Sequence, residues 1–329
     1  MANLLRAPER VVRTPVADSR RWNRFKPRDD DIVIATFAKC GTTWTQRIVD
    51  LLVFQSPDVR PFGDISPWLD STLFSPVEDD LATLAAQTHR RYIKSHLPFD
   101  ALPVWDMVKY IHVGRDGRDA RLSWQNHEKG FKPDFRAHIG AQAMALAAEQ
   151  GAAPSGPPPQ PPEHPREYLL HWFDELEAQL NAQDKSGPNN FGSQFFDFEA
   201  TYWQERHRPN LLCVQYNDMK EDLAGEMQRI AKFLDITVPK GLMPSLVEAA
   251  RFETMKKDGN ALFPKLTKVF DTGADRFINK GRSGRWREYL KAEDVARYDA
   301  IVKRACTPGL AAWLEGGRRA AGDPSSSGD

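Results

Sequence analysis

The sequence predicts an α/β fold with a mostly parallel central sheet flanked by helices. Four short runs rich in apolar and β-branched residues have the length and composition of buried parallel strands, and residues at helical spacing follow three of them. These runs are residues 31–36, 91–94, 108–113 and 211–216. Strands that alternate with helices are typical of this fold class. Because such sheets bind ligands where strands end and helices begin, the loops after the strands are the predicted functional positions.

Composition excludes several classes of function. The chain has 329 residues with 41% hydrophobic and 27% charged residues, which is ordinary for a soluble globular protein. Lys plus Arg and Asp plus Glu both number 45, and this balance argues against nucleic acid as a partner. Apolar runs are too short to span a membrane. The three cysteines, Cys40, Cys213 and Cys306, are odd in number and widely spaced, which favours the reducing cytoplasm over a disulfide framework or a zinc site.

The predicted organisation is one domain over residues 1–315 with an excursion at 131–166. Residues 137–153 are rich in alanine and are compatible with a helix, whereas residues 154–165 hold seven prolines in twelve positions and predict an extended or disordered segment. The excursion is either a lid or substrate loop or a variable surface insertion. The Gly- and Ser-rich residues 316–329 predict a flexible tail.

The first motif with chemical potential is Lys39-Cys-Gly-Thr-Thr-Trp44, directly after the first strand. Gly41 allows the backbone to approach a ligand, and the amides at a helix start near Thr42 and Thr43 bind anions. Lys39 adds a positive charge. The arrangement is P-loop-like, but the lysine precedes the glycine instead of following it. A helix start capped by threonine is the alternative.

Two further motifs follow the next two strands. Lys94-Ser-His-Leu-Pro98 places His96 beside a lysine, and histidine is the side chain best suited to accept a proton near neutral pH. Arg115 leaves the third strand where a guanidinium can clamp a phosphate, and Ser123 lies two helical turns later. For this third motif the alternative is a solvated turn in which Arg118 pairs with Asp116 or Asp119.

The fourth motif is Phe277-Ile-Asn-Lys-Gly-Arg-Ser-Gly-Arg-Trp286. Its two glycines and its basic and amide side chains predict a flexible anion-binding loop, with an ordinary basic surface loop as the alternative. Zinc-protease, Rossmann and serine-hydrolase motifs are absent, and so is an acidic cluster for Mg²⁺ after a strand.

Together, the four motifs resemble those of the cytosolic-type sulfotransferases, which use 3′-phosphoadenosine 5′-phosphosulfate (PAPS) and release adenosine 3′,5′-bisphosphate (PAP). The resemblance runs from about residue 25 to 305. It implies that PAPS is the sulfuryl donor, that no metal is needed, and that the acceptor is a small molecule bearing a hydroxyl group or an amine. The nucleotide-binding residues implied by the resemblance are Lys39, Cys40, Gly41, Thr42, Thr43, Trp44, Arg115, Ser123, Tyr216, Phe252, Ile278, Asn279, Lys280 and Gly281.

The resemblance also implies catalytic roles in an in-line displacement at sulfur. His96 is the general base, Lys39 supports the bridging oxygen of the leaving phosphate, and Lys94 stabilises the transferring sulfuryl group. Ser123 binds the 3′-phosphate and restrains Lys39 until an acceptor arrives.

Several departures from the family pattern leave questions open. Cys40 stands where the family has serine, Asn279 stands where it has arginine, and its dimer motif has no clear match in residues 285–294. The oligomeric state and the acceptor, whether phenol, alcohol, glycan or amine, therefore stay open. Two other functions remain as alternatives: a P-loop-type kinase using ATP, and a non-catalytic nucleotide-binding protein of the same fold.

Overall fold

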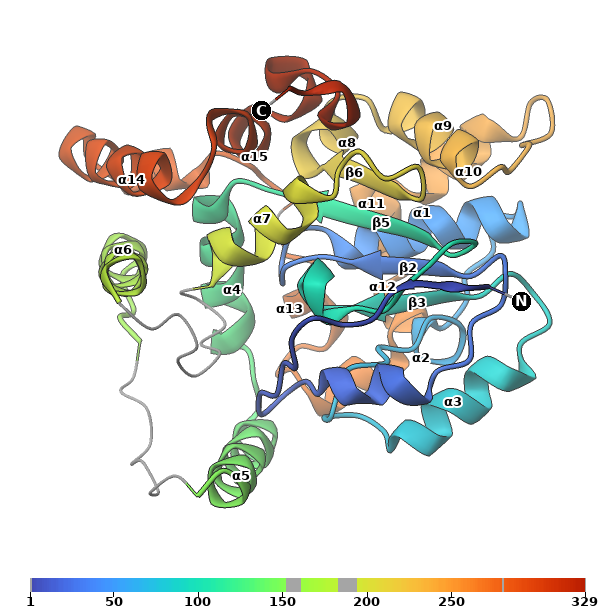
Figure 1. Ribbon diagram of the computed structural model, residues 1–329, viewed down its shortest axis with the longest axis horizontal. Helices are drawn as coiled ribbons and strands as arrows, with labels where there is room; N and C mark the ends of the chain where they lie inside the picture. The colour runs from blue at the N-terminus through green and yellow to red at the C-terminus, as the bar shows by residue number, and fades with distance from the viewer. Residues whose placement is uncertain (1, 152–160, 183–193, 280, 329) are drawn as a thin grey trace.

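A parallel four-stranded sheet forms the centre of the computed structural model, which describes residues 2–151, 161–182, 194–279 and 281–328. The strand order is β3 (Tyr92–Ser95), β2 (Ile32–Ala35), β5 (Lys109–Gly114) and β6 (Leu211–Gln215), and every neighbouring pair is parallel. Each strand falls on one of the four predicted runs. The predicted α/β fold with helices around a parallel sheet is confirmed (Figure 1).

Helices cover both faces of the sheet because successive side chains of a buried strand point in opposite directions. In β2, Ile32 and Ile34 pack against α1 (Thr42–Phe54), α9 (Leu223–Phe233) and α10 (Met243–Ala249).

Val33 and Ala35 point to the opposite core. That core contains residues of η1 (Ser19–Arg24), α6 (Pro165–Asn181), α7 (Phe195–Gln204) and α15 (Pro308–Ala321). The two cores explain why the strand sequences are apolar at every position.

The remaining elements surround this three-layer centre. β1 (Leu4–Arg6) and β4 (Val104–Trp105) form a separate antiparallel pair. The other helices are α2 (Phe62–Ile65), α3 (Val77–Ala86), η2 (Phe99–Ala101), α4 (Gly117–Lys129), α5 (Pro133–Glu149), α8 (Tyr216–Glu221), α11 (Phe252–Lys257), α12 (Gly259–Leu262), η3 (Pro264–Lys268), α13 (Ala274–Phe277), η4 (Arg285–Glu288), α14 (Ala292–Ala305) and η5 (Pro324–Ser326).

The expected flexible tail at residues 316–329 has a different structure over its described part, 316–328. Helical structure reaches Ala321 across a break in the helix at Gly317, and η5 follows it. Gly317 adopts a left-handed φ of 70°, and Arg318 N donates to Asp218 Oδ2 (2.7 Å). Composition was misleading here because the buried residues Trp313 and Leu314 anchor the segment, and its glycine permits a close approach to α8.

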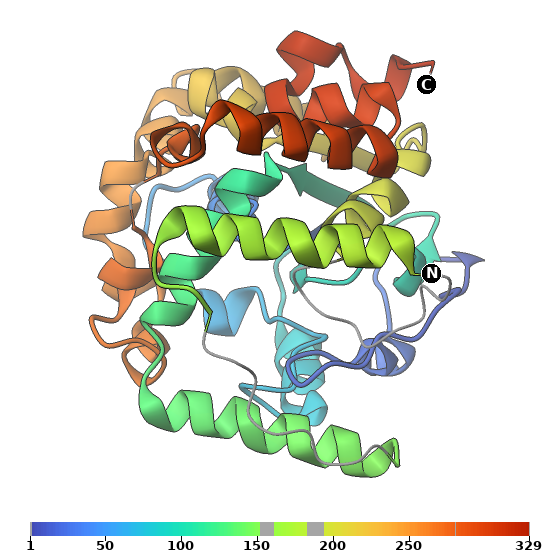
Figure 2. The ribbon, with the colours of Figure 1, turned by 90° about the vertical axis from the view of Figure 1, so that its left-hand side faces the viewer.

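The excursion at residues 131–166 contains α5, a helix none of whose residues is buried. Figures 1 and 2 both show α5 at the edge of the molecule, apart from α6 and α14, which pack against each other. Of the proline-rich stretch, residues 154–160 lie outside the described residues. Among the described helices, none combines the length and apolar character required to cross a bilayer.

Candidate active site

The carboxyl ends of β2, β3 and β5 open into a cleft of about 2650 Å³. Fourteen of the sixteen predicted site residues line this one cleft. They are Lys39, Gly41, Thr42, Thr43, Trp44, Lys94, His96, Arg115, Ser123, Tyr216, Phe252, Ile278, Asn279 and Gly281. Lys280 lies outside the described residues, and Cys40 does not line the cleft. The structure thus brings all four sequence motifs together.

The loop between β2 and α1 forms one end of the cleft. Gly41 has a φ of 111°, and a Cβ there would come within 3.0 Å of the Tyr216 ring. Because the N-cap of α1 is Gly41, which has no side chain, the predicted alternative of a threonine cap does not apply. The first amides of a helix have no partner within the helix, so this end of α1 is suited to an anion.

Cys40 departs from its predicted position in the site. Its side chain is fully buried, its thiol lies 3.8 Å from the Ala38 carbonyl, and its backbone N–H donates to Phe37 O (3.3 Å). Burial raises the pKa of the thiol well above its usual value, so the group is neutral. Lys39, which precedes Cys40, has a left-handed φ of 67° and lines the cleft, whereas Cys40 does not.

Arg115 is buried beside the loop between β2 and α1. Its Nη1 donates to Lys39 O (2.8 Å), its Nη2 donates to Arg282 O (3.3 Å), and its guanidinium lies 4.1 Å from the Tyr216 ring centre. Within the described part of the chain, its buried Nε has no hydrogen-bond partner. An incoming anion can satisfy this guanidinium.

The neighbouring charged residues have structural partners. Arg118 pairs with Asp116, as the alternative for this motif expected, but the turn is buried and not solvated. Arg118 Nη2 donates to Asp116 Oδ2 (2.7 Å) and to Glu315 (2.8 Å). Asp119 accepts from the backbone N–H groups of Gly284 (2.6 Å) and Arg285 (3.2 Å). Asp119 therefore fixes the fourth motif beside the third.

Lys39 Nζ finds a partner that sequence reasoning missed. It lies 3.2 Å from His127 Nδ1 and 4.7 Å from the centre of the Phe277 ring. Burial, and then the charges of Arg115 and Lys94, lower the pKa of Lys39 to about 7. His127 follows Ser123 by four residues in α4, so helical spacing places both on one face and was the available signal.

His96 and Lys94 lie on the cleft floor beside Trp68. His96 Nδ1 is 2.7 Å from Thr36 O, and because a carbonyl only accepts, this nitrogen carries the proton and Nε2 is the basic nitrogen. Burial, and then the Lys94 charge, hold the pKa of His96 well below its usual value. Lys94 Nζ lies 4.4 Å from the Trp68 ring centre, and burial lowers the pKa of this lysine to about 8.

Helix α5 forms the opposite wall of the cleft. Phe135, Ile139, Ala143 and Met144 of α5 line it, and the Phe135 ring stacks on Phe74 with their centres 6.2 Å apart. The wall is apolar at these four positions, and the polar side chains of Arg136 and His138 line the cleft beside them.

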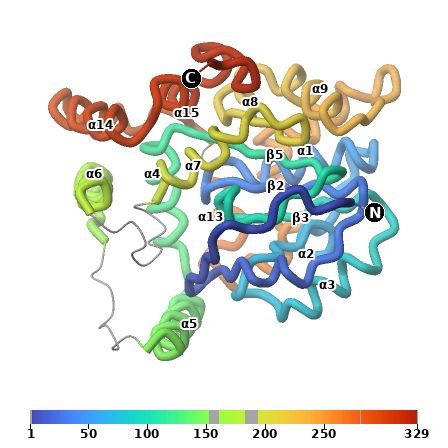
Figure 3. The backbone as a smooth tube through the Cα atoms, in the orientation of Figure 1, coloured from blue at the N-terminus to red at the C-terminus, as the bar shows by residue number. Residues whose placement is uncertain are grey.

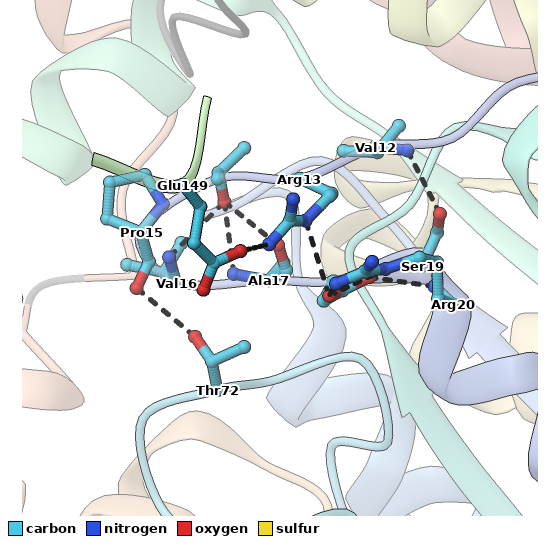
Figure 4. A network of polar contacts seen from close by, with 11 residues as sticks. Val12, Arg13, Pro15, Val16, Ala17, Ser19, Arg20, Thr72 and Glu149 are labelled. Carbon is cyan, nitrogen blue, oxygen red and sulfur yellow. Dashed lines mark hydrogen bonds and ion pairs between the residues drawn. The ribbon is translucent and has the colours of Figure 1, made fainter. Parts of the chain in front are cut away.

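The far end of α5 meets the N-terminal segment through an ion pair between Arg13 and Glu149 (Figure 4). Arg13 also lies 3.6 Å from Asp18, and Pro15 O accepts from Thr72 Oγ1 (3.1 Å), which ties the segment to the loop before α3. The wall is thus held mainly by contacts at the protein surface.

Comparison with known proteins identifies the family. A family model for the sulfotransferase domain matches residues 29–310. The chain belongs to the sulfotransferase family. It is similar to a glycolipid sulfotransferase of Mycobacterium bovis, with 35% identity over 313 residues that cover 94% of this chain and 95% of that protein. It is also similar to sulfotransferase 1B1 of Canis lupus familiaris, with 27% identity over 290 residues and 85% of each chain covered.

Solved structures share the sulfotransferase fold. Mouse sulfotransferase SULT7A1 complexed with PAP superposes with a TM-score of 0.61 at 20% identity, covering 89% of this chain and 90% of that one. Retinol dehydratase in a complex with retinol and PAP gives a TM-score of 0.63 at 22% identity, with 88% and 84% covered. Over the described residues, the structure contains no group of three or more metal-ligating side chains.

Proposed function

We propose that this sulfotransferase moves the sulfuryl group of PAPS to a hydroxyl group of a lipid-linked sugar, with His96 as the general base. One observation carries the proposal. Lys39, Lys94, His96 and Arg115, which come from the carboxyl ends of three neighbouring strands and the loops after them, converge on one cleft beside the start of α1. The comparisons do not favour the ATP-dependent kinase or the non-catalytic binding protein that the sequence left open.

The donor end of the cleft suits a nucleotide with two anionic groups. The first amides of α1 and Lys39 would hold the 5′-phosphosulfate, whereas Arg115 and Ser123 would hold the 3′-phosphate. The unpartnered Arg115 Nε supports this assignment. Tyr216 and Phe252 line the same region and would contact the adenine.

His96 has the properties of a base that works near neutral pH. Its lowered pKa keeps it neutral, and the hydrogen bond to Thr36 O leaves Nε2 free to accept the proton of the acceptor hydroxyl. Lys94 would then neutralise charge on the transferring sulfuryl group, and Lys39 would support the departing bridging oxygen. Both lysines gain protonation when an anion enters, because an adjacent negative charge raises the pKa of a lysine.

The lipid-linked acceptor is inferred from the size and lining of the cleft together with the named relative. Pockets for drug-sized ligands typically have volumes of about 300–1,000 Å³, and this cleft reaches about 2650 Å³. The apolar side chains of α5 and Phe74 suit an alkyl chain. The relative with 35% identity is named a glycolipid sulfotransferase. We also infer a cytoplasmic location, which the free thiols of Cys40, Cys213 and Cys306 support.

The test uses ³⁵S-labelled PAPS and three acceptors that differ only in alkyl length: methyl, octyl and dodecyl glucoside. We expect labelled product, with kcat/KM rising with chain length by at most about fourfold per buried methylene, which corresponds to ~0.8 kcal/mol. Titration with PAP provides the control. Tight PAP binding without transfer to any glucoside would overturn the acceptor class, whereas absent PAP binding would overturn the donor.

A further inference from the structure

A fully buried carboxylate lies beneath the cleft floor in the loop between α2 and α3. Asp70 is 0% exposed, and each of its side-chain oxygens accepts hydrogen bonds. Trp22 Nε1 donates to Oδ1 (3.2 Å), and Trp68 Nε1 donates to Oδ2 (2.7 Å). The backbone N–H of His96 also donates to Oδ2 (3.1 Å). The Ser95 hydroxyl is a further hydrogen-bond partner of this carboxylate, and each of the four hydrogen bonds lowers the pKa of Asp70. The three N–H donors have no acceptor lone pair, so they match an ionised carboxylate.

The backbone around Asp70 extends the edge of the sheet. Lys94 N donates to Pro67 O (3.0 Å), and Leu69 N donates to Lys94 O (3.2 Å), so this loop runs beside β3 like a further strand. The N-terminal segment, blue in Figure 3, covers the loop, and Asp18 N donates to Asp70 O (2.8 Å). The position of Asp70 relative to β3 is therefore set by backbone contacts on both sides.

Through Trp68, the carboxylate reaches both proposed catalytic groups. The Trp68 ring lies edge-on to His96, with ring centres 4.8 Å apart, and beneath Lys94 Nζ at 4.4 Å. Rotation of the indole would disturb both contacts. The hydrogen bond from Nε1 to Asp70 holds this ring in its present orientation.

Charge also links Asp70 to Lys94. Burial lowers the pKa of Lys94, and the Asp70 carboxylate opposes this effect. The other titratable groups near Lys94 are Lys39, His96 and His127. Lysine and histidine side chains are either neutral or positive, so none of them supplies negative charge. Asp70 is thus the nearby source of negative charge that favours the protonated lysine in the unliganded cleft.

We propose that Asp70 is a positioning residue that orients Trp68 and the His96 backbone and serves as the buried counter-charge of Lys94. The catalytic consequence rests on the proposed function, whereas the effect on Lys94 does not. At a pH near 8, loss of the carboxylate leaves a larger fraction of Lys94 neutral, and a neutral lysine is a poor partner for a sulfuryl group.

The direct test is an NMR titration of Lys94 in full-length protein carrying ¹³Cε-labelled lysine, without nucleotide. Asp70→Asn is expected to shift the Lys94 midpoint down by roughly one pH unit, since removal of an opposite charge disfavours the charged form. Asp100→Asn is the matched control. Asp100 pairs with Arg10 (2.7 Å) outside the cleft lining, so its loss leaves the midpoint unchanged. An unshifted midpoint in Asp70→Asn overturns the proposal.

A second measurement needs no variant. In the wild-type chain with ¹³Cγ-labelled aspartate, Asp70 is expected to be ionised at pH 7, although burial raises the pKa of this carboxyl above its usual value. A protonated Asp70 at that pH contradicts the counter-charge role.

Kinetics then connect the residue to the reaction. Asp70→Asn is expected to lower kcat about tenfold, to move the alkaline limb of the pH profile to lower pH, and to leave PAP affinity within a few-fold. Asp70→Glu, which keeps the charge, is expected to restore the position of that limb. If the alkaline limb lies at the same pH in wild type, Asp70→Asn and Asp70→Glu, Asp70 has only a structural role. Absence of turnover in the wild-type enzyme would count against the proposed function and leave the NMR result intact.

Discussion

The donor end of the cleft and the wall formed by α5 differ in how the fold holds them. Arg115 and Thr42 lie at the ends of buried strands or at helix starts, and their exposures are below a tenth. In contrast, α5 contains no buried residue and meets the body through Phe74, Val269 and the Arg13–Glu149 pair. Surface ion pairs contribute only about 0–1 kcal/mol, so α5 is the weakly held part.

This difference indicates how the molecule divides its tasks. A nucleotide donor carries the same negative charges in every turnover. The carboxyl edge of the sheet holds the cationic side chains and amides that bind these charges in fixed positions. An apolar wall on a peripheral helix can change in sequence or position without disturbing those groups. We therefore expect changes at the two ends of the cleft to affect different measurements.

The largest expected effect concerns His96. We expect His96→Ala to lower kcat by about 10²–10⁴-fold, because the acceptor proton loses its base. PAP affinity should stay within a few-fold of wild type, as measured by calorimetry. His207→Ala, at an exposed histidine bonded to Ser325 O, is the control. A near-normal kcat with a saturating alcohol acceptor would refute the assignment of His96 as base.

Arg115 provides the next largest effect. We expect Arg115→Ala to weaken PAP by about 10–100-fold, since one charge-assisted hydrogen bond is worth about 1.5–3 kcal/mol. Adenosine 5′-phosphate lacks the 3′-phosphate, so its affinity should change much less. Titration of both ligands checks this. Equal weakening of both would locate the 3′-phosphate elsewhere in the cleft.

Protonation of the two lysines predicts a pH effect on nucleotide binding. The pKa of Lys39 is lowered to about 7 and that of Lys94 to about 8, and a bound anion raises both. PAP binding at pH 8 should therefore take up protons, and PAP affinity should fall as the pH rises from 7 to 9. Calorimetry in two buffers of different ionisation enthalpy counts the protons. Proton release on binding contradicts the assignment, and Lys39→Ala should reduce the uptake.

A smaller effect than that of Arg115 is expected at α5. Phe135→Ala should lower kcat/KM for dodecyl glucoside by about 5–20-fold through loss of apolar contact, and should change that for methyl glucoside little. The exposed Met107, which does not line the cleft, offers Met107→Ala as a control. Loss of activity that is equal for both glucosides would show that α5 does not contact the alkyl chain.

The sequence was informative where function depends on local pattern. The four strands and the loops after them were predictable because apolar runs, glycines and helix starts are local signals. Tyr216 and Phe252 were found only through the family resemblance, since neither has a distinctive local context. Gly316 and Gly317 suggested a flexible tail by composition, whereas the anchoring by Trp313 depends on residues about 200 positions away, such as Gly114.

The residues that sequence reasoning missed act through long-range contacts. The pairing of His127 with Lys39 joins residues 88 positions apart, and it depends on the angle at which α4 leaves β5. Asp70 comes close to Lys94 and His96 only because its loop pairs with β3, and the sequence gives no sign of this pairing. Cys40 lies outside the cleft lining, and sequence spacing gave no sign of this, because the backbone before it turns through a left-handed φ at Lys39 that non-glycine residues rarely adopt.

A pair of measurements tests most directly whether the donor end of the cleft and the α5 wall act separately. PAP affinity and dodecyl glucoside kcat/KM are measured for wild type, Asn279→Arg and Phe135→Ala. The account predicts that Asn279→Arg tightens PAP by about threefold or more, through an added charge-assisted contact, with kcat/KM for the acceptor nearly unchanged at saturating PAPS. Phe135→Ala should show the opposite pattern. If Phe135→Ala weakens PAP as strongly as it weakens the acceptor, the two ends are not separate, and the account is contradicted.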